Sequence, residues 1–188
     1  MGLVDHLRIH FGEDGGDAAA WSFDDAGFGI VTYDDQPVRG AITYLTMGLS
    51  RHVLEQRSGK SICQELLMSV RADQKEISPE RSLASLAHDF LERHSPIPDG
   101  QVIGWQGGVF PGSRFTAVFC TSARYFPESF AHVDCDPPIV FVWLIPITES
   151  EATYCRSHGA SAFEDLLVAQ DPDLLDLDRP ELTIPCSD

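Results

Sequence analysis

The stretch Ile139–Pro180, IVFVWLIPITESEATYCRSHGASAFEDLLVAQDPDLLDLDRP, decides the fold of this chain. It opens with a continuous apolar run, Ile139–Ile145, which predicts a strand covered on both faces. We therefore expect this strand to be central in its sheet and Trp143 to be buried. Pro146 is expected to end the strand, because proline has no backbone N–H to give to a sheet.

Two helices are expected after this strand, and each has the sequence of a capping box at its start. In the first box, Thr148 and Glu151 would satisfy backbone N–H groups at the start of the helix. Gly159 suits the left-handed conformation that often follows a helix, so the first helix is expected to end there. Ser161 and Glu164 repeat the capping box for the second helix. These signals predict a scaffold that displays carboxylates rather than a catalytic centre.

The remaining segments alternate between strands and helices without a regular order. Helices are predicted before Gly12 and after Ser78, a serine cap with proline at the first helical position. Two strands, at 41–49 and 62–70, are expected to pair antiparallel. Further strands are predicted at 28–33, 101–105 and 114–122. The irregular order predicts an α+β fold, with a mixed, mostly antiparallel sheet and helices packed against it.

Length and composition fit a globular domain that occupies the whole chain, residues 1–188. No apolar run is long enough to span a membrane, and residues 1–11 lack the continuous apolar region of a signal peptide. The five cysteines include no C-x-x-C pair, which argues against zinc knuckles and thioredoxin-like motifs. Cys63, Cys120 and Cys155 are expected to be buried, reduced thiols. Together these features predict a cytoplasmic protein.

The net charge of the chain is strongly negative. Asp and Glu number 29 against 13 Lys and Arg, which gives a formal charge of −16. Such a field repels phosphate backbones, so nucleic acid is not an expected partner. It attracts basic partners and speeds their encounter, although acidic charge can also serve solubility alone. Both interpretations of the charge remain open at the level of sequence.

One loop carries residue types that bind transition metals. Its sequence, His132-Val133-Asp134-Cys135-Asp136, offers imidazole, thiolate and carboxylate groups. A metal-dependent hydrolase centred on His132, Asp134 and Cys135 is therefore the alternative function. Short spacing within one loop rarely presents several ligands to one ion, so we expect no metal and no catalytic centre here.

The other chemical motifs are incomplete. Asp171-Pro172-Asp173 lacks the turn glycine and the late glutamate of a calcium loop. The glycine-rich segments 12–16 and 104–112 lack the lysine and the spacing of a phosphate-binding loop. No Gly-x-Ser-x-Gly nucleophile elbow exists. The sequence thus indicates a non-catalytic protein with no cofactor.

Carboxylates gather near the end of the chain, where we expect a partner-binding surface. Seven acidic residues lie between 164 and 181, against a single arginine. The predicted contact residues are Glu164, Asp165, Asp171, Asp173, Asp176 and Asp178. Leu174, Leu175 and Leu177 would anchor this arm while its aspartates face water; a merely solvated acidic tail is the alternative. Trp105 is a further candidate contact, because half-exposed tryptophans often anchor interfaces, with core packing as its alternative role.

Several segments resemble, in the same order, the Suppressor of fused domain in its small bacterial form. These segments are Thr43–Ser50, Glu65–Met68, Pro79–Leu91, Gln101–Trp105 and Ile139–Pro180. The first resembles that family's strand ending in a Gly-Leu-Ser turn, and the third resembles its central amphipathic helix. The match covers most of the chain from about residue 42 to residue 180. Residues 1–40 form an N-terminal segment that matches least, and 177–188 form a C-terminal tail.

The resemblance implies a non-catalytic protein-binding module. Animal Suppressor of fused proteins hold a transcription factor, but this chain stops soon after the shared domain, so that function is not expected here. Small bacterial members resemble immunity proteins that neutralise toxins. The implied partner is therefore a basic toxin domain, with nucleases as the first class to consider. An acidic inhibitor suits such a partner because opposite fields steer association.

Overall fold

The computed structural model describes residues 2–12, 21–23 and 27–185. Their helices are α1 (Leu3–Phe11), α2 (Pro79–Arg93), α3 (Glu149–His158) and α4 (Ala160–Gln170). Their strands are β1 (Trp21–Phe23), β2 (Phe28–Asp34), β3 (Ala41–Met47), β4 (Leu54–Glu55), β5 (Ser61–Arg71), β6 (Gln101–Gly104), β7 (Phe115–Ser122), β8 (His132–Val133) and β9 (Ile139–Thr148). The strands predicted from the sequence are all found, with small changes at their ends.

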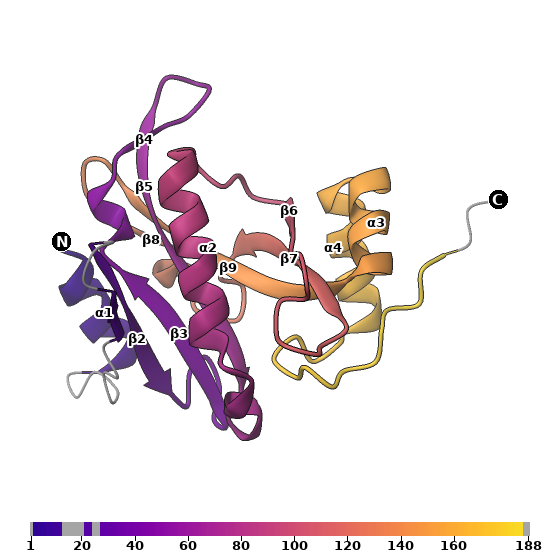
Figure 1. Cartoon of the computed structure of the whole chain (residues 1–188). Helices are drawn as coiled ribbons and strands as arrows, with labels where there is room; N and C mark the ends of the chain where they lie inside the picture. The colour runs from indigo at the N-terminus through magenta and orange to yellow at the C-terminus, as the bar shows by residue number, and fades with distance from the viewer. Residues whose placement is uncertain (1, 13–20, 24–26, 186–188) are drawn as a thin grey trace.

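The strands form a sheet in the order β1-β2-β3-β5-β9-β7-β6, with β4 beside β5 and β8 beside β9 (Figure 1). Neighbouring strands run antiparallel except for β5 and β9, which run parallel with Leu67 opposite Trp143. β3 and β5 are the antiparallel pair expected from the sequence, with Tyr44 opposite Met68. The predicted mixed, mostly antiparallel sheet is therefore confirmed.

β9 is central in this sheet, as predicted, because it lies between β5 and β7. Trp143 is only 1% exposed. The prediction that Pro146 ends the strand is wrong, since β9 continues to Thr148. β5 pairs with β9 only as far as Trp143, so Pro146 has a partner strand on one side alone, where it lies opposite Val118 of β7. Proline is tolerated at such an edge-like position, because no second strand needs its N–H.

Helices cover both faces of the sheet (Figure 1). α2 packs on one face, where Leu86 and Phe90 join apolar side chains of the central strands. α1, α3 and α4 pack on the other face through residues that include Leu7, Cys155 and Phe163. Helices packed against a mostly antiparallel sheet make this an α+β fold, as expected. Among the described helices, none is long and apolar enough to cross a membrane.

The helix starts follow the sequence signals only in part. The capping box of Thr148 and Glu151 is present at the start of α3, so this prediction is confirmed. The second predicted box is wrong, because α4 starts directly after Gly159 and Ser161 therefore lies inside its first turn. The helix start predicted at Ser78-Pro79 is confirmed, because α2 begins at Pro79, but the expected capping by the serine side chain is wrong. Its backbone is left-handed, with φ of 59°, and its side chain makes no capping hydrogen bond.

Three of the cysteines behave as small apolar residues of the core. Cys63, Cys120 and Cys155 are buried, as predicted, and are free thiols. Burial raises the pKa of the Cys120 thiol to about 12. This thiol therefore stays protonated near neutral pH and is a poor nucleophile.

A C-terminal arm, residues 171–185, leaves α4 and packs back onto the sheet. Leu175 is buried, and its carbonyl oxygen accepts a hydrogen bond of 2.9 Å from the backbone N–H of Arg71 at the end of β5. Leu174 and Leu177 pack, half-buried, against the two cores. The predicted anchoring of the arm by its leucines is therefore confirmed. Farther along, Arg179 enters the interior next to α3.

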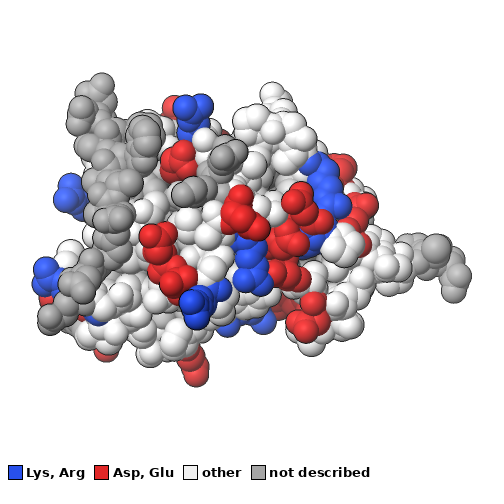
Figure 2. Space-filling model, turned by 90° about the horizontal axis from the view of Figure 1, so that it is seen from below, with Lys and Arg blue, Asp and Glu red and all other residues white. Residues whose placement is uncertain are grey.

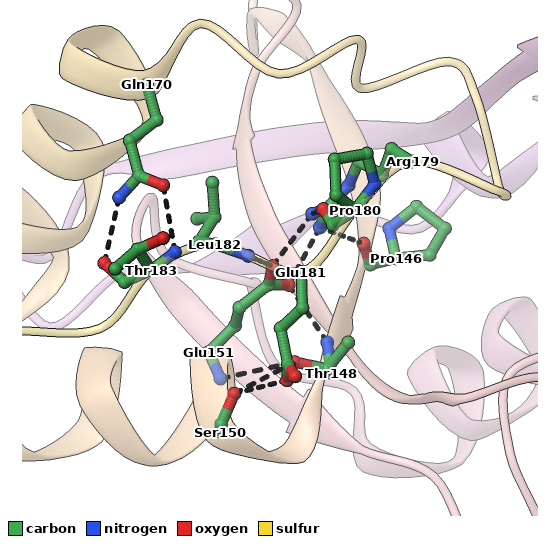
Figure 3. A network of polar contacts seen from close by, with 10 residues as sticks. All are labelled: Pro146, Thr148, Ser150, Glu151, Gln170, Arg179, Pro180, Glu181, Leu182 and Thr183. Atoms are coloured by element: carbon green, nitrogen blue, oxygen red, sulfur yellow. Dashed lines mark hydrogen bonds and ion pairs between the residues drawn. The ribbon is translucent and has the colours of Figure 1, made fainter.

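A network of polar contacts holds the arm against α3 (Figure 3). The two carboxylate oxygens of Glu151 accept hydrogen bonds from the two terminal nitrogens of Arg179, each at 2.7 Å. The same carboxylate accepts the backbone N–H groups of Thr148 and Leu182 at 3.0 and 3.1 Å. Because both charged side chains are buried, each charge is balanced where water is excluded. The network thereby fixes the arm relative to α3 and the end of β9.

Candidate functional site

The carboxylates predicted to contact a partner lie on α4 and the C-terminal arm. They are Glu164, Asp165, Asp171, Asp173, Asp176 and Asp178. They follow one strip of surface, because the arm turns directly out of α4 and docks beside the end of β5. Figure 2 shows the molecule from below Figure 1, where the arm runs, and acidic side chains gather there with basic ones between them. The members of the strip have different roles.

Asp173 and Asp176 hold the arm in place, contrary to the prediction that the aspartates face water. The Asp173 carboxylate pairs with the Arg71 guanidinium at 2.5 Å. Asp176 accepts a hydrogen bond from the side-chain amide of Gln74 at 2.8 Å. The amide oxygen of Gln74 in turn accepts the backbone N–H of Leu177 at 2.9 Å. These side chains fasten the arm to the segment that follows β5.

Glu164 is tied to the segment that follows β7. Its carboxylate pairs with the Arg124 guanidinium at 2.5 Å. Because the Arg124 side chain is half exposed, such a pair contributes only about 0–1 kcal/mol to stability. The pair matters more for the surface charge than for stability, because the guanidinium of Arg124 neutralises the carboxylate of Glu164. Asp165, Asp171 and Asp178 are the exposed carboxylates of the strip.

A groove that the sequence did not predict runs beside these exposed carboxylates. Its deeper part is a pocket of about 130 Å³ between α4, the start of the arm and the strands β7 and β9. Its shallower part continues past Tyr125 toward Val38 and Arg71. Tyr125, Asp171 and Pro172 line both parts, so they form one continuous feature. We name it the Tyr125 groove.

The deeper part of the Tyr125 groove has an aromatic wall and a packed floor. The Tyr125 ring lies against the Trp143 ring, with the ring centroids 4.8 Å apart. Phe119 and Ile145 reach the pocket from β7 and β9, and Leu167 reaches it from α4. Phe119, Ile145 and Trp143 also belong to the core between the sheet and the helices. The floor is therefore rigid, because close-packed side chains have little room to move.

Trp105, the remaining predicted contact, lies apart from the Tyr125 groove. It is half-buried and packs against the core on the α2 face of the sheet. Its backbone N–H donates to the carbonyl oxygen of Thr116 at 2.7 Å, which extends the pairing of β6 with β7. Core packing, the alternative role considered for Trp105, therefore accounts for much of its side chain.

The loop after β8 gives no support to the alternative of a metal-dependent hydrolase. Among the described residues, no three His, Cys, Asp or Glu side chains are placed to hold a metal ion. The Cys135 thiol points to the carbonyl oxygens of Val133 and Pro137, at 3.6 and 3.2 Å. His132 and Asp134 are exposed.

Glu65 is a buried carboxylate that shapes the turn after β3. It accepts the Thr46 hydroxyl at 2.6 Å and the backbone N–H groups of Gly48 and Ser50 at 2.9 and 3.0 Å. Gly48 has φ of 120°, and a Cβ there would lie 2.7 Å from the carbonyl oxygen of Gly27, so only glycine fits. Burial raises the pKa of the Glu65 carboxyl, although these hydrogen bonds oppose the shift. The Gly-Leu-Ser turn is thus built around Glu65.

Comparison with protein families gives one match over most of the chain. The family model described as Suppressor of fused protein (SUFU) matches residues 24–180. A SUFU (suppressor of fused protein) homologue from Neisseria gonorrhoeae FA 1090 has a similar crystal structure, with a TM-score of 0.76 and 16% sequence identity. That match covers 97% of this chain and 96% of the homologue.

Two further solved structures have the same fold. The crystal structure of the Sufu-Fu complex matches with a TM-score of 0.68 and 12% identity, over 96% of this chain and 90% of that chain. Drosophila Suppressor of Fused matches with a TM-score of 0.60 and 14% identity, over 82% of this chain but 42% of its own chain. A search of curated protein sequences found no match. At these identities the structural likeness establishes the fold.

Proposed function

This chain belongs to the Suppressor of fused protein family, and on that basis we propose that it is a non-catalytic, protein-binding domain of the immunity type. In this proposal residues 1–188 act as one domain that binds a basic toxin and neutralises it. A protein partner is supported by the similar fold found in a Sufu-Fu complex. A basic partner is supported by the net charge of −16.

The observation that carries this proposal is the strip of carboxylates on a support of fixed geometry. The Arg71–Asp173 and Glu151–Arg179 pairs fasten the arm to the rest of the fold. Charges on a fixed support lose little conformational freedom on binding, which lowers the free-energy cost of association. Opposite charge on the partner would then raise the association rate by steering the encounter.

Neutralisation would follow from covering the cationic surface of the toxin. A nuclease binds nucleic acid largely through Lys and Arg contacts with phosphates. Carboxylates that pair with those side chains compete with nucleic acid for the same surface. A basic nuclease is therefore the toxin class that suits this chain. Asp165, Asp171 and Asp178 would make the first contacts because they are exposed.

Inhibition of a basic nuclease toxin tests the proposed function directly. We expect the purified chain to form a complex with a basic nuclease toxin domain and to stop cleavage of nucleic acid by that domain. Toxin domains encoded by neighbouring genes are the first to test. Because the mechanism is occupancy of a surface, an equimolar amount should suffice when both proteins are well above their dissociation constant. A toxin domain that cleaves at an unchanged rate in excess of this chain would refute the proposal.

Association kinetics test the contact surface separately. Changing Asp165, Asp171 and Asp178 together to Asn should slow association at low salt and weaken its salt dependence, since exposed charges act by steering that salt screens. Stopped-flow mixing at several salt concentrations measures both effects.

The control for this experiment removes three exposed charges from another part of the surface. It combines Glu128→Gln, Asp134→Asn and Asp136→Asn, around β8. The control should retain more of the wild-type association rate than the arm variant does. Unchanged association of the arm variant would move the contact surface elsewhere, with the turn from Trp105 to Gly112 as the next candidate.

A further inference from the structure

We propose that the Tyr125 groove is the anchor site of the partner interface, and that it takes a large apolar side chain next to a basic residue of the bound protein. This inference rests on the proposed function, because it names the chemistry by which the same face recognises its partner. It adds an apolar contact to a surface that the proposed function describes only by its charges.

The size and lining of the pocket fit a ring or a branched aliphatic group. Its volume is about 130 Å³, and its lining is mostly apolar, with Trp143 and Tyr125 among the contributing side chains. An apolar cavity of about 150 Å³ in another protein binds benzene, so the space is of the right order for a Phe or Leu side chain. Aromatic and aliphatic anchors in such pockets supply much of the binding energy of protein interfaces.

The exposed apolar residues of the molecule also point to this groove. Six large hydrophobic residues are exposed among the described residues, and three of them line the Tyr125 groove. They are Val168, Tyr125 and Val38, with 78%, 39% and 44% of their surface exposed. Single exposed apolar residues are normal on a protein surface, but three of them along one groove favour an interaction site.

The charges at the groove favour a cation beside the anchor. Ion pairs join Arg124 to Glu164 and Arg71 to Asp173, so these four side chains largely neutralise one another. Asp171 lines both parts of the groove and is exposed. It thus leaves a negative charge at the mouth, within reach of a residue adjacent to the anchor.

The position of Asp171 at the end of α4 strengthens this preference. Its backbone N–H donates to the carbonyl oxygen of Leu167 at 2.9 Å, and its φ of 43° turns the chain out of the helix. The C-terminus of a helix carries partial negative charge, which adds to the charge of the carboxylate. A Lys or Arg side chain next to the anchor would therefore meet a fixed negative site.

Short blocked peptides test the groove without the partner protein. The probes are N-acetyl-Phe-Arg-amide, N-acetyl-Ala-Arg-amide and N-acetyl-Phe-Glu-amide, titrated into 15N-labelled protein and followed by NMR. We expect Phe-Arg to bind most tightly and to shift the signals of Tyr125, Trp143 and α4. Loss of the ring or reversal of the charge should each weaken binding several-fold.

A matched pair of variants locates the binding. Val168→Arg places bulk and positive charge at the mouth of the pocket and should weaken Phe-Arg binding about tenfold. Val53→Arg makes the same change at another exposed valine, before β4 and away from the groove, and should leave binding unchanged. Both side chains face solvent, so neither change should prevent folding.

Two outcomes of the peptide experiment would overturn the groove as the anchor site. The first is Phe-Arg binding that Val168→Arg leaves intact, and the second is equal binding of all three peptides. Failure of the proposed function is a separate result, namely no inhibition of the toxin. A toxin domain bound equally well by wild type and Val168→Arg would likewise exclude the groove while leaving the protein-binding function in place.

Discussion

Arg179 and Glu151 place opposite charges inside the protein, and their geometry explains how the fold tolerates them. Their side chains are 2% and 0% exposed, and both carboxylate oxygens are paired with the guanidinium. The remaining capacity of the carboxylate is used by the backbone of Thr148 and Leu182. A buried charge that loses its partner is costly, because water cannot replace the partner.

Removal of the Arg179 charge should therefore destabilise the protein strongly. We expect Arg179→Met to lower the free energy of unfolding by about 3–5 kcal/mol, the usual cost of leaving a buried charge unpaired. Arg156→Met is the control, because Arg156 and Glu149 are 3.5 Å apart and solvent-exposed, and its cost should be about 0–1 kcal/mol. Urea unfolding measures both. Similar losses in the two variants would show that the buried pair has no special role.

The carboxyl group of Glu65 should give stability a measurable pH dependence. Its folded-state pKa is raised above the ordinary 4.5 by burial. The folded state therefore holds this proton more tightly than the unfolded state, and the associated stability is present below about pH 4.5 and lost as pH rises through the folded pKa. Glu65→Gln cannot ionise, so it should gain stability relative to wild type as pH rises from about 4 to about 8.

Glu181 provides a control with the opposite sign. Hydrogen bonds from the Ser150 and Thr148 hydroxyls lower the pKa of its carboxyl. Its stabilising effect is therefore present above the unfolded pKa and lost as pH falls. Glu181→Gln should lose stability relative to wild type as pH rises, when urea midpoints are compared across the same pH series. Parallel trends in the two variants would contradict this assignment.

At the scale of elements, signals carried by neighbouring residues predicted most of the fold. The apolar run at Ile139–Ile145 predicted a central strand, and Thr148 with Glu151 predicted the start of α3. The predictions failed where the structural role of a residue depends on other elements or on the exact start of a helix. Pro146 lies within β9 rather than at its end, because β5 pairs with β9 only as far as Trp143 and no strand on that side needs the missing N–H. Ser161 does not cap α4, because the helix begins one residue earlier, at Ala160.

The docking of the arm could not be predicted because it joins residues that are far apart in the sequence. Arg71 and Asp173 are separated by 102 positions, and no local pattern links them. The Tyr125 groove is missed for the same reason, since its walls come from separate elements. One signal was available. Leu167 and Val168 are consecutive apolar residues in α4, and a helix that buries a single face leaves one of them in solvent.

The two predicted capping boxes give a direct test of these local rules. Thr148→Ala should lower the free energy of unfolding by about 1 kcal/mol, because the hydroxyl caps α3. Ser161→Ala should change it by less than about 0.5 kcal/mol, because that side chain is exposed in the first turn of α4. Thermal and urea unfolding measure both. A larger loss of unfolding free energy in Ser161→Ala than in Thr148→Ala would show that the Ser161 side chain does cap α4.

Across the whole molecule, the acidic C-terminal part of the chain stabilises the fold as well as charging its surface. The ion pairs among the described residues join Arg71 to Asp173, Arg124 to Glu164, Arg156 to Glu149 and Arg179 to Glu151. In each pair the carboxylate comes from residues 149–173. Those arginines are therefore already occupied, and most of the excess negative charge stays on the surface, as Figure 2 shows for one face.

The parallel pairing of β5 with β9 also joins two units of the sheet, which we expect to form at different stages of folding. In the first unit, neighbouring strands of the sheet follow the order of the sequence: β1, β2, β3 and β5. In the second unit, the order across the sheet is β9, β7 and β6, the reverse of their order in the sequence. The strands within each unit are closer in the sequence than β5 and β9 are, since Leu67 of β5 lies opposite Trp143 of β9, so we expect the junction of the two units to form last. The C-terminal arm also links the two units, because its residues Asp173 and Asp176 bond to Arg71 and Gln74 at and after the end of β5. A chain cut in the exposed turn between α2 and β6 would thus leave two fragments that can recognise each other and rebuild the native sheet.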